Sequence, residues 1–107
     1  MNCRILFTDT AKLDLRDIAV YIADLSKDKN QTIRFVKELQ EKTKILEQFP
    51  ENGATPRDRV LKSNGYRFLV HKDYLIVYLY EKSENTVHIM AVGGGRRDYV
   101  RAMKKFL

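Results

Sequence analysis

The apolar residues of this chain change their spacing halfway along it, and no other feature of the sequence constrains the fold as strongly. Over residues 11–49 they recur every three or four positions, which is typical of amphipathic helices. Over residues 66–92 they form runs of aromatic and β-branched residues between short polar pieces, which is typical of strands. A chain of 107 residues is long enough for one buried core. We therefore expect a single α+β domain, residues 1–107.

The helical half predicts an antiparallel two-helix hairpin after a short strand at residues 3–7. The first helix, residues 11–25, follows "TDT", whose side chains can accept hydrogen bonds from a helix start. The second helix, residues 30–49, begins after Asp28, which with the glutamine three positions on resembles a capping box. Pro50 is expected to end it. Each helix offers one apolar face, so the hairpin should pack on a sheet.

The second half predicts that sheet. Three runs, residues 66–71, 74–80 and 86–92, are separated by turn-length pieces and indicate an antiparallel meander. With the N-terminal strand we expect a three- to four-stranded antiparallel sheet, and a further short strand near Val60. Along the central run tyrosines alternate with leucines and a valine, so the helices should cover one of two apolar faces. The other face, tyrosine-lined or leucine-lined, is a candidate surface for a partner.

The positive charge lies entirely in the second half. Residues 1–56 hold nine Lys/Arg against nine Asp/Glu, whereas residues 57–107 hold eleven against five, which is the whole net charge of +6. A basic region of this kind indicates an anionic partner, such as nucleic acid, an acidic protein segment or a membrane surface. A basic domain without a specific anionic partner fits equally well.

Localisation and cofactors follow from what the sequence lacks. "MNCRILFTDT" has no signal-peptide pattern and no run is long enough to cross a membrane, so we expect a cytoplasmic protein. Cys3 is expected to be a small buried hydrophobe, and no cysteine or histidine spacing indicates a metal site. His71 and His88 have no companion that would make either a general base. We expect neither metal nor cofactor.

Arginine and tyrosine residues carry what chemistry the sequence offers. The three glycines at 93–95 should let the chain turn off the last strand into a short basic C-terminal helix or tail. Arginines bind phosphate well, and in an RNA-cleaving site they would stabilise charge while a phenol moved a proton. Alternatively, Arg97 and Asp98 form a local ion pair and the tail is solvated. The candidate binding residues are Arg67, Arg96, Arg97, Tyr99, Arg101, Lys104 and Lys105, of which Arg67, Arg97 and Tyr99 would be catalytic in a nuclease.

Several motifs together resemble one protein family. The helical half contains A-x-x-D-L-x-x-I-x-x-Y-I in "AKLDLRDIAVYI" and L-x-x-x-P-x-x-G in "LEQFPENG". The second half contains "GYRFLVHKDYLIVYLYEKSENTVHIMAV" and then "GRRDY". In this order they resemble the RelE/ParE superfamily of toxins from bacterial type II toxin–antitoxin modules, over nearly the whole chain. The resemblance implies a growth-inhibiting toxin, with a role in plasmid stabilisation, whose partner is a small, acidic, partly disordered antitoxin.

The resemblance leaves two targets open. RelE-like toxins cut mRNA in the ribosome without a metal, using basic residues on the strands and near the C-terminus, whereas ParE-like toxins poison DNA gyrase by binding it. In RelE-like nucleases the central strand resembles G-Y-R-L-V-Y, and here "DYLIVYL" places Leu75 where the arginine is expected. We therefore favour gyrase binding, with a ribosome-dependent mRNA endoribonuclease as the alternative. A plain nucleic-acid-binding module ranks last, because no exposed aromatic platform or recognition-helix pattern is evident.

Overall fold

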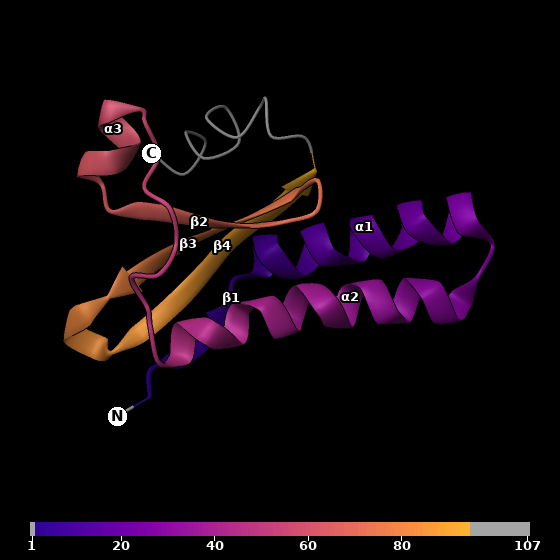
Figure 1. Cartoon of the computed structure of the whole chain (residues 1–107), viewed down its shortest axis with the longest axis horizontal. Coiled ribbons are helices and arrows are strands. Elements are labelled where there is room, and N and C mark those ends of the chain that lie inside the picture. The colour runs from indigo at the N-terminus through magenta and orange to yellow at the C-terminus, as the bar shows by residue number, and fades with distance from the viewer. Residues whose placement is uncertain (1, 95–107) are drawn as a thin grey trace.

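The computed structural model describes residues 2–94, and residues 1 and 95–107 lie outside that description. The described part contains three α-helices and four strands (Figure 1), and two short 3-10 helices, here named η1 and η2. The elements in chain order are β1 (Arg4–Phe7), α1 (Asp9–Ser26), α2 (Lys29–Thr43), η1 (Lys44–Glu47), α3 (Arg59–Ser63), β2 (Tyr66–His71), β3 (Tyr74–Glu81), η2 (Lys82–Glu84) and β4 (Thr86–Gly94).

The four strands form one sheet in the order β1-β4-β3-β2. The predicted meander is confirmed, because β2 pairs antiparallel with β3 and β3 antiparallel with β4. β1 adds to β4 in parallel, so the sheet is mixed and the expectation of an antiparallel sheet is wrong for β1. The long excursion of the chain through both helices, β2 and β3 before it returns to β4 permits this direction, since parallel neighbours need such a crossover.

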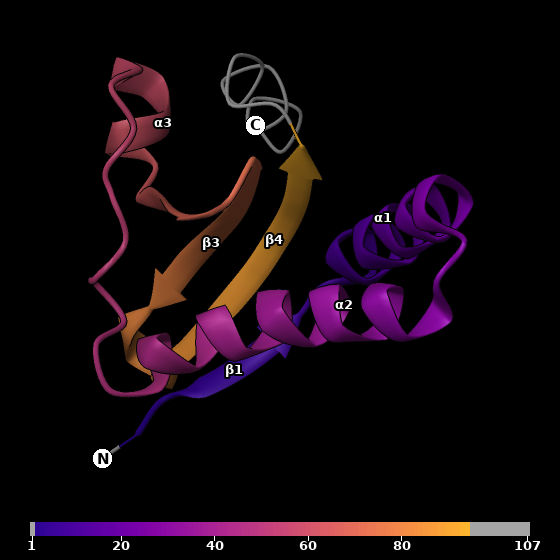
Figure 2. The same cartoon turned by 45° about the vertical axis from the view of Figure 1, so that its right-hand side comes forward.

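The helical hairpin covers one face of this sheet, as Figure 2 shows from the side. The tyrosines of β3 lie on this covered face, and Tyr78 is fully buried within the main core. A fully buried aliphatic side chain contributes about 1.5–3 kcal/mol relative to an exposed one. The main core therefore joins the helices to β2, β3 and β4. Its fully buried members include Ala11, Leu39, Leu46, Ile76, Tyr78, Val87 and Ile89.

Side-chain caps begin both long helices. Thr8 Oγ1 accepts the N–H of Ala11 at 3.1 Å and donates to the carbonyl of Ile89 at 2.9 Å, so the cap also ties α1 to β4. Asp28 Oδ1 accepts the N–H groups of Asn30 and Gln31 at 3.0 and 3.2 Å, which confirms its predicted capping role. Each such cap contributes about 1 kcal/mol.

The tip of the hairpin projects beyond the sheet (Figure 1). α1 has 18 residues and is therefore about 27 Å long. Two residues of the predicted apolar faces near the tip are therefore exposed: Leu25 at 68% and Ile33 at 45%. None of the described helices is both long and apolar enough to cross a membrane.

Two local predictions are wrong. The strand expected near Val60 is the helix α3, because the carboxylate of Asp58 accepts the N–H of Leu61 at 3.1 Å and starts a helical turn. α2 ends at Thr43, well before Pro50, and continues as η1. The hydroxyl of Thr43 donates to the carbonyl of Gln40 at 2.6 Å, a local bond that competes with the α-helical pattern.

The turn expected at the glycines is also misplaced. Gly93 and Gly94 belong to β4, opposite Leu75 and Tyr74 of β3. A Cβ on Gly94 would lie 3.3 Å from a ring carbon of Tyr74, so glycine leaves room for that ring. Gly95 lies outside the described residues.

Candidate interaction surfaces

Arg67 lies on β2 and holds the loop that follows the helices. Its Nη1 donates to the carbonyls of Glu51 and Gly53, both at 3.1 Å, and to Thr55 Oγ1 at 3.4 Å. Arg67 is opposite Tyr78, whose side chain belongs to the core under the helices. Arg67 therefore sits on the helix-covered side of the sheet and fastens the loop 51–55 there.

Gly53 makes two of the hydrogen bonds that hold this loop against the sheet. Its N–H donates to the hydroxyl of Tyr78 at 2.8 Å, while its carbonyl receives Arg67. Burial raises the pKa of the Tyr78 hydroxyl, which outweighs the opposite effects of the Gly53 N–H and of the Arg67 charge. Tyr78 consequently stays a neutral phenol that accepts one hydrogen bond within the core.

The sheet keeps Arg67 apart from the start of the C-terminal segment. Arg67 pairs with Tyr78, whereas Gly94, the last described residue, pairs with Tyr74. At roughly 3.3 Å per residue these positions are about 13 Å apart along β3. The remaining predicted site residues, Arg96, Arg97, Tyr99, Arg101, Lys104 and Lys105, lie outside the described residues.

The face of the sheet away from the helical hairpin is lined by leucine and valine. Val77 packs there with Leu61 of α3, Tyr66 and Ala91, and Leu79 lies at the margin of this second cluster. Leu75, which alternates with the tyrosines of the covered face, is 4% exposed and lies opposite Gly93. The face of the sheet that the helical hairpin leaves uncovered is therefore the leucine-lined one, and the tyrosine-lined face is the covered one.

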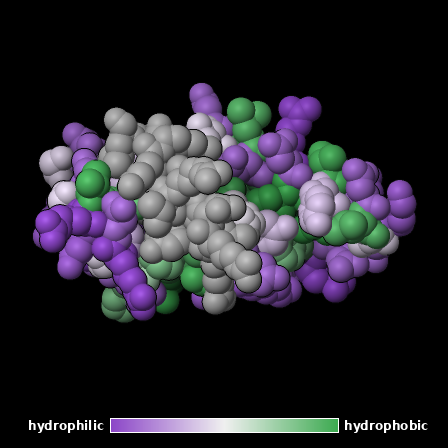
Figure 3. Space-filling model, turned by 90° about the horizontal axis from the view of Figure 1, so that it is seen from above, coloured by the Kyte–Doolittle hydropathy of each residue, from purple (hydrophilic) through white to green (hydrophobic). Residues whose placement is uncertain are grey.

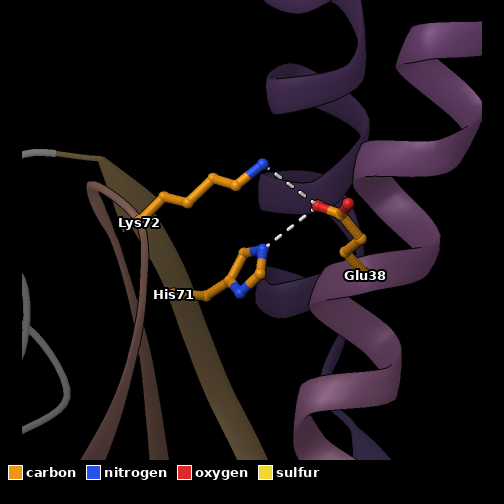
Figure 4. Close-up of polar contacts among 3 residues, drawn as sticks. All are labelled: Glu38, His71 and Lys72. Carbon is orange, nitrogen blue, oxygen red and sulfur yellow. Dashed lines mark hydrogen bonds and ion pairs between the residues drawn. The ribbon is translucent and has the colours of Figure 1, made fainter.

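Both histidines are paired with a glutamate, and one pair is part of a larger cluster (Figure 4). Nε2 of His71 and Nζ of Lys72 each lie 3.3 Å from Oε2 of Glu38 on α2. The Lys72 ammonium also lies 5.3 Å from the ring centroid of Phe35. This cluster fastens the β2–β3 turn to α2.

The cluster predicts a pH dependence of stability. Hydrogen bonds from His71 and Lys72 lower the pKa of Glu38 below its usual 4.5. The folded state therefore gains stability above that value and loses it as the pH falls through the lowered pKa. We expect Glu38→Gln to reduce the free energy of unfolding near neutral pH. In urea unfolding repeated at acid pH, where the wild-type Glu38 is protonated, the variant should match the wild type. Glu84→Gln, at a carboxylate that forms no ion pair among residues 2–94, controls for the change in net charge. A deficit of Glu38→Gln that does not vary with pH would contradict this.

Asp14 of α1 has a specific partner on β4. Its Oδ2 accepts the N–H of Val92 at 3.0 Å. β1 ends at Phe7, opposite Ile89, so at Val92 β4 is paired with β3 on one side and has no strand on the other, the side of β1. The carboxylate replaces the missing strand and holds β4 just before Gly93. The A-x-x-D spacing was the available signal, since Asp14 lies one helical turn beyond the buried Ala11.

Loss of this contact should be measurable. Asp14→Ala leaves the Val92 N–H without its acceptor, so we expect the free energy of unfolding to fall by about 1.5–3 kcal/mol. Asp14→Asn keeps an acceptor oxygen and should lose less. Asp24→Ala, which removes an exposed carboxylate further along α1, is the control in the same urea titrations. A similar small loss in all three variants would refute the assigned role.

The surface beside the end of β4 is acidic and aromatic. A pocket of about 480 Å³ is lined by Asp17 and Tyr21 of α1, Asp73 and Tyr74 of the β2–β3 hairpin, and Gly94. Burial raises the pKa of Tyr74, and Tyr21 and Asp73 add to the shift. Such a pocket suits a cation rather than a phosphate.

Among residues 2–94 no three His, Cys, Asp or Glu side chains lie close enough to hold a metal ion. Cys3 is buried and its Sγ donates to the carbonyl of Leu46 at 3.0 Å, consistent with a packing role.

Figure 3 shows the top of the molecule, where hydrophobic side chains are scattered among hydrophilic ones at the helical end. The exposed apolar residues of α1 are Leu13, Val20, Tyr21 and Leu25.

One family model matches most of the chain. The model of the ParE toxin of the type II toxin–antitoxin system parDE matches residues 5–99. A search of curated protein sequences found no match.

Solved structures of toxins share the fold. The chromosomal ParDE system of P. aeruginosa aligns with a TM-score of 0.73 and 19% identity over 88% of this chain and 97% of that one. The RelBE2 toxin–antitoxin complex of Mycobacterium tuberculosis gives 0.66 and 21%, over 88% and 92%. A mutant of the E. coli toxin RelE in the free state gives 0.63 and 18%, over 100% of both chains.

Proposed function

The chain belongs to the ParE toxin family of type II toxin–antitoxin systems, and we propose that it inhibits growth by binding DNA gyrase in the cytoplasm. We further propose that a cognate antitoxin binds it, because the similar ParDE and RelBE2 structures are toxin–antitoxin systems. The antitoxin would be small and acidic, with a disordered segment that folds on the toxin.

The observation that carries the choice of target is Leu75. It is an apolar, buried residue on β3, at the position where the resemblance to RelE-like nucleases calls for an arginine. Loss of one charged group that stabilises a transition state typically costs on the order of a hundredfold in rate. A toxin that acts by binding does not need that charge.

The contacts with gyrase would come from the cations after β4. Residues 95–107 carry five Lys/Arg and one Asp, which accounts for +4 of the net charge of +6. Arg67 would contribute as well, because Nη2 and Nε have no hydrogen-bond partner among residues 2–94 while Nη1 holds the loop. Tyr99 would add a phenol to the same surface.

The second candidate function is a ribosome-dependent mRNA endoribonuclease, favoured by the likeness to RelE over the full length of both chains. In it Arg67 and Arg97 would stabilise the scissile phosphate, and Tyr99 would move the proton. Neither function requires a cofactor.

Induced expression separates the two. If the toxin binds gyrase, DNA damage signalling should rise while primer extension finds translated mRNA uncut. If it is a nuclease, cuts should appear within translated frames, and Arg97→Ala should abolish them. In either case the product of the adjacent reading frame should co-purify with the toxin and relieve the growth arrest, and failure of both would refute the toxin–antitoxin assignment.

A further inference from the structure

The side of β4 that faces β1 changes partner along its length. Over Thr86–Ile89 it pairs with β1, and after Ile89 no strand among residues 2–94 lies on that side. On its other side β4 pairs with β3 as far as Gly94. The second half of β4 therefore has a strand on one side only, and the hydrogen bonds that residues 2–94 make to its other side come from α1 and the residue that caps it.

A β-bulge lies where the pairing with β1 ends. The register of β4 against β3 skips Met90, which is therefore an extra residue of β4. Such a bulge bends the strand and increases its local twist. The hydroxyl of Thr8, which caps α1, lies 2.9 and 3.1 Å from the carbonyl oxygens of Ile89 and Met90. The bend in β4 is therefore anchored on the start of α1.

Asp14 holds β4 beyond this bulge. Its bond to the N–H of Val92, at 3.0 Å, is the last hydrogen bond between α1 and β4 among residues 2–94. Ala11 and Leu15, its neighbours on α1, are buried in the main core, so the carboxylate extends from a fixed part of the helix. A hydrogen bond to a carboxylate is also stronger than one between neutral groups. The course of β4 just before its glycines therefore depends on Asp14.

The residues after Val92 restrain the chain only weakly. Gly93 and Gly94 end β4, and a Cβ on Gly93 would meet nothing within 4 Å. Glycine has the widest choice of backbone conformations, so neighbouring contacts must set the direction of the chain here. Arg96 and Arg97 follow in the sequence, within three residues that span at most roughly 11 Å. A shift of the backbone at Val92 therefore moves both arginines.

We propose that Asp14 is a positioning residue of the toxin. By holding Val92 it fixes the direction in which the chain leaves β4, and so presents Arg96 and Arg97 to the target. This inference rests on the proposed function, in which those arginines contact gyrase. Groups that are held in place before binding lose less freedom on binding and so bind more tightly. Asp14 therefore contributes to the affinity for the target as well as to the stability of the fold.

Inhibition of gyrase supercoiling by the purified full-length toxin separates positioning from stability. Asp14→Ala should raise the toxin concentration for half-inhibition about tenfold, at a temperature where circular dichroism shows the variant folded. Asp14→Asn keeps an acceptor oxygen and should recover most of that loss. Asp28→Ala is the matched control, because it also removes a carboxylate that accepts backbone N–H groups, but at the tip of the helical hairpin. This control should inhibit as the wild type does.

A double-mutant cycle shows whether Asp14 acts through the arginines. Asp14→Ala should cost a smaller factor in a toxin that already carries Arg97→Ala than in the wild type, because one of the positioned groups is then missing. Equal factors in the two backgrounds would overturn the proposal. Equal inhibition by Asp14→Ala and the wild type would overturn it as well, and so would equal losses in Asp14→Ala and Asp28→Ala.

A second measurement does not depend on the target. If the wild-type toxin leaves supercoiling undisturbed, the gyrase proposal fails, and the role of Asp14 is then decided by the order of the backbone it holds. In 15N relaxation of the full-length toxin, the order parameter of the Gly94 N–H should be near 0.85 in the wild type and in Asp28→Ala, and below about 0.6 in Asp14→Ala. Equal order at Gly94 in the wild type and Asp14→Ala would overturn the proposal, whichever target the toxin has.

Discussion

Gly53→Ala is expected to lower the free energy of unfolding by about 3 kcal/mol, since overpacking a core typically costs 1–3 kcal/mol and a hydrogen bond is lost as well. A Cβ at this position would lie 2.5 Å from the Tyr78 hydroxyl oxygen and 2.9 Å from the carbonyl oxygen of Phe68. The core around Tyr78 is fully buried and the Phe68 carbonyl is already paired with Ala54, so neither neighbour can move freely.

Thermal unfolding followed by circular dichroism measures this effect. For a domain of this size 1 kcal/mol corresponds to roughly 4–8 °C in Tm, so a fall of more than about 10 °C is expected. Gly93→Ala is the matched control, because a Cβ there would meet nothing within 4 Å. If both variants melt close to the wild type, the loop is not held as described.

The double variant Arg96→Glu and Arg97→Glu is expected to weaken binding of the antitoxin by about a hundredfold or more, since like charges placed across an interface cost several kcal/mol. The two arginines follow directly after β4 and its glycines, in the half of the chain that carries the whole net charge of +6. Reversing them removes two of the five cations of residues 95–107 and adds repulsion toward an acidic partner.

Isothermal titration calorimetry of each variant with the antitoxin gives the affinities. Lys37→Glu, a charge reversal on the exposed surface of α2, is the control and should change the affinity severalfold at most. The loss in the double variant should shrink as salt is added, because salt screens exposed charges. Equal affinities of wild type and double variant would exclude the C-terminal arginines from the interface.

The sequence predicted the two long helices and the meander because their apolar periodicities are strong and local. It did not reveal that β1 runs parallel to β4, since direction is not encoded in alternation. The β-branched Val60 indicated a strand, but the residues around it form the helix α3 because Asp58 caps its N-terminus.

The candidate site was harder to predict, because its geometry depends on contacts between distant parts of the chain. The guanidinium makes Arg67 a candidate, but its hydrogen bonds to the loop 51–55 depend on how that loop returns to β2. The N–H that Asp14 accepts belongs to Val92, 78 residues later in the chain. Spacing within one element cannot show such partners.

A DNA supercoiling assay with purified toxin and gyrase tests most directly the proposal that this toxin acts by binding gyrase. We expect that the wild-type chain inhibits supercoiling, that Arg97→Ala inhibits it less, and that added antitoxin restores it. Undisturbed supercoiling at toxin concentrations that arrest growth, together with mRNA cut within translated frames, would contradict the claim and establish the nuclease in its place.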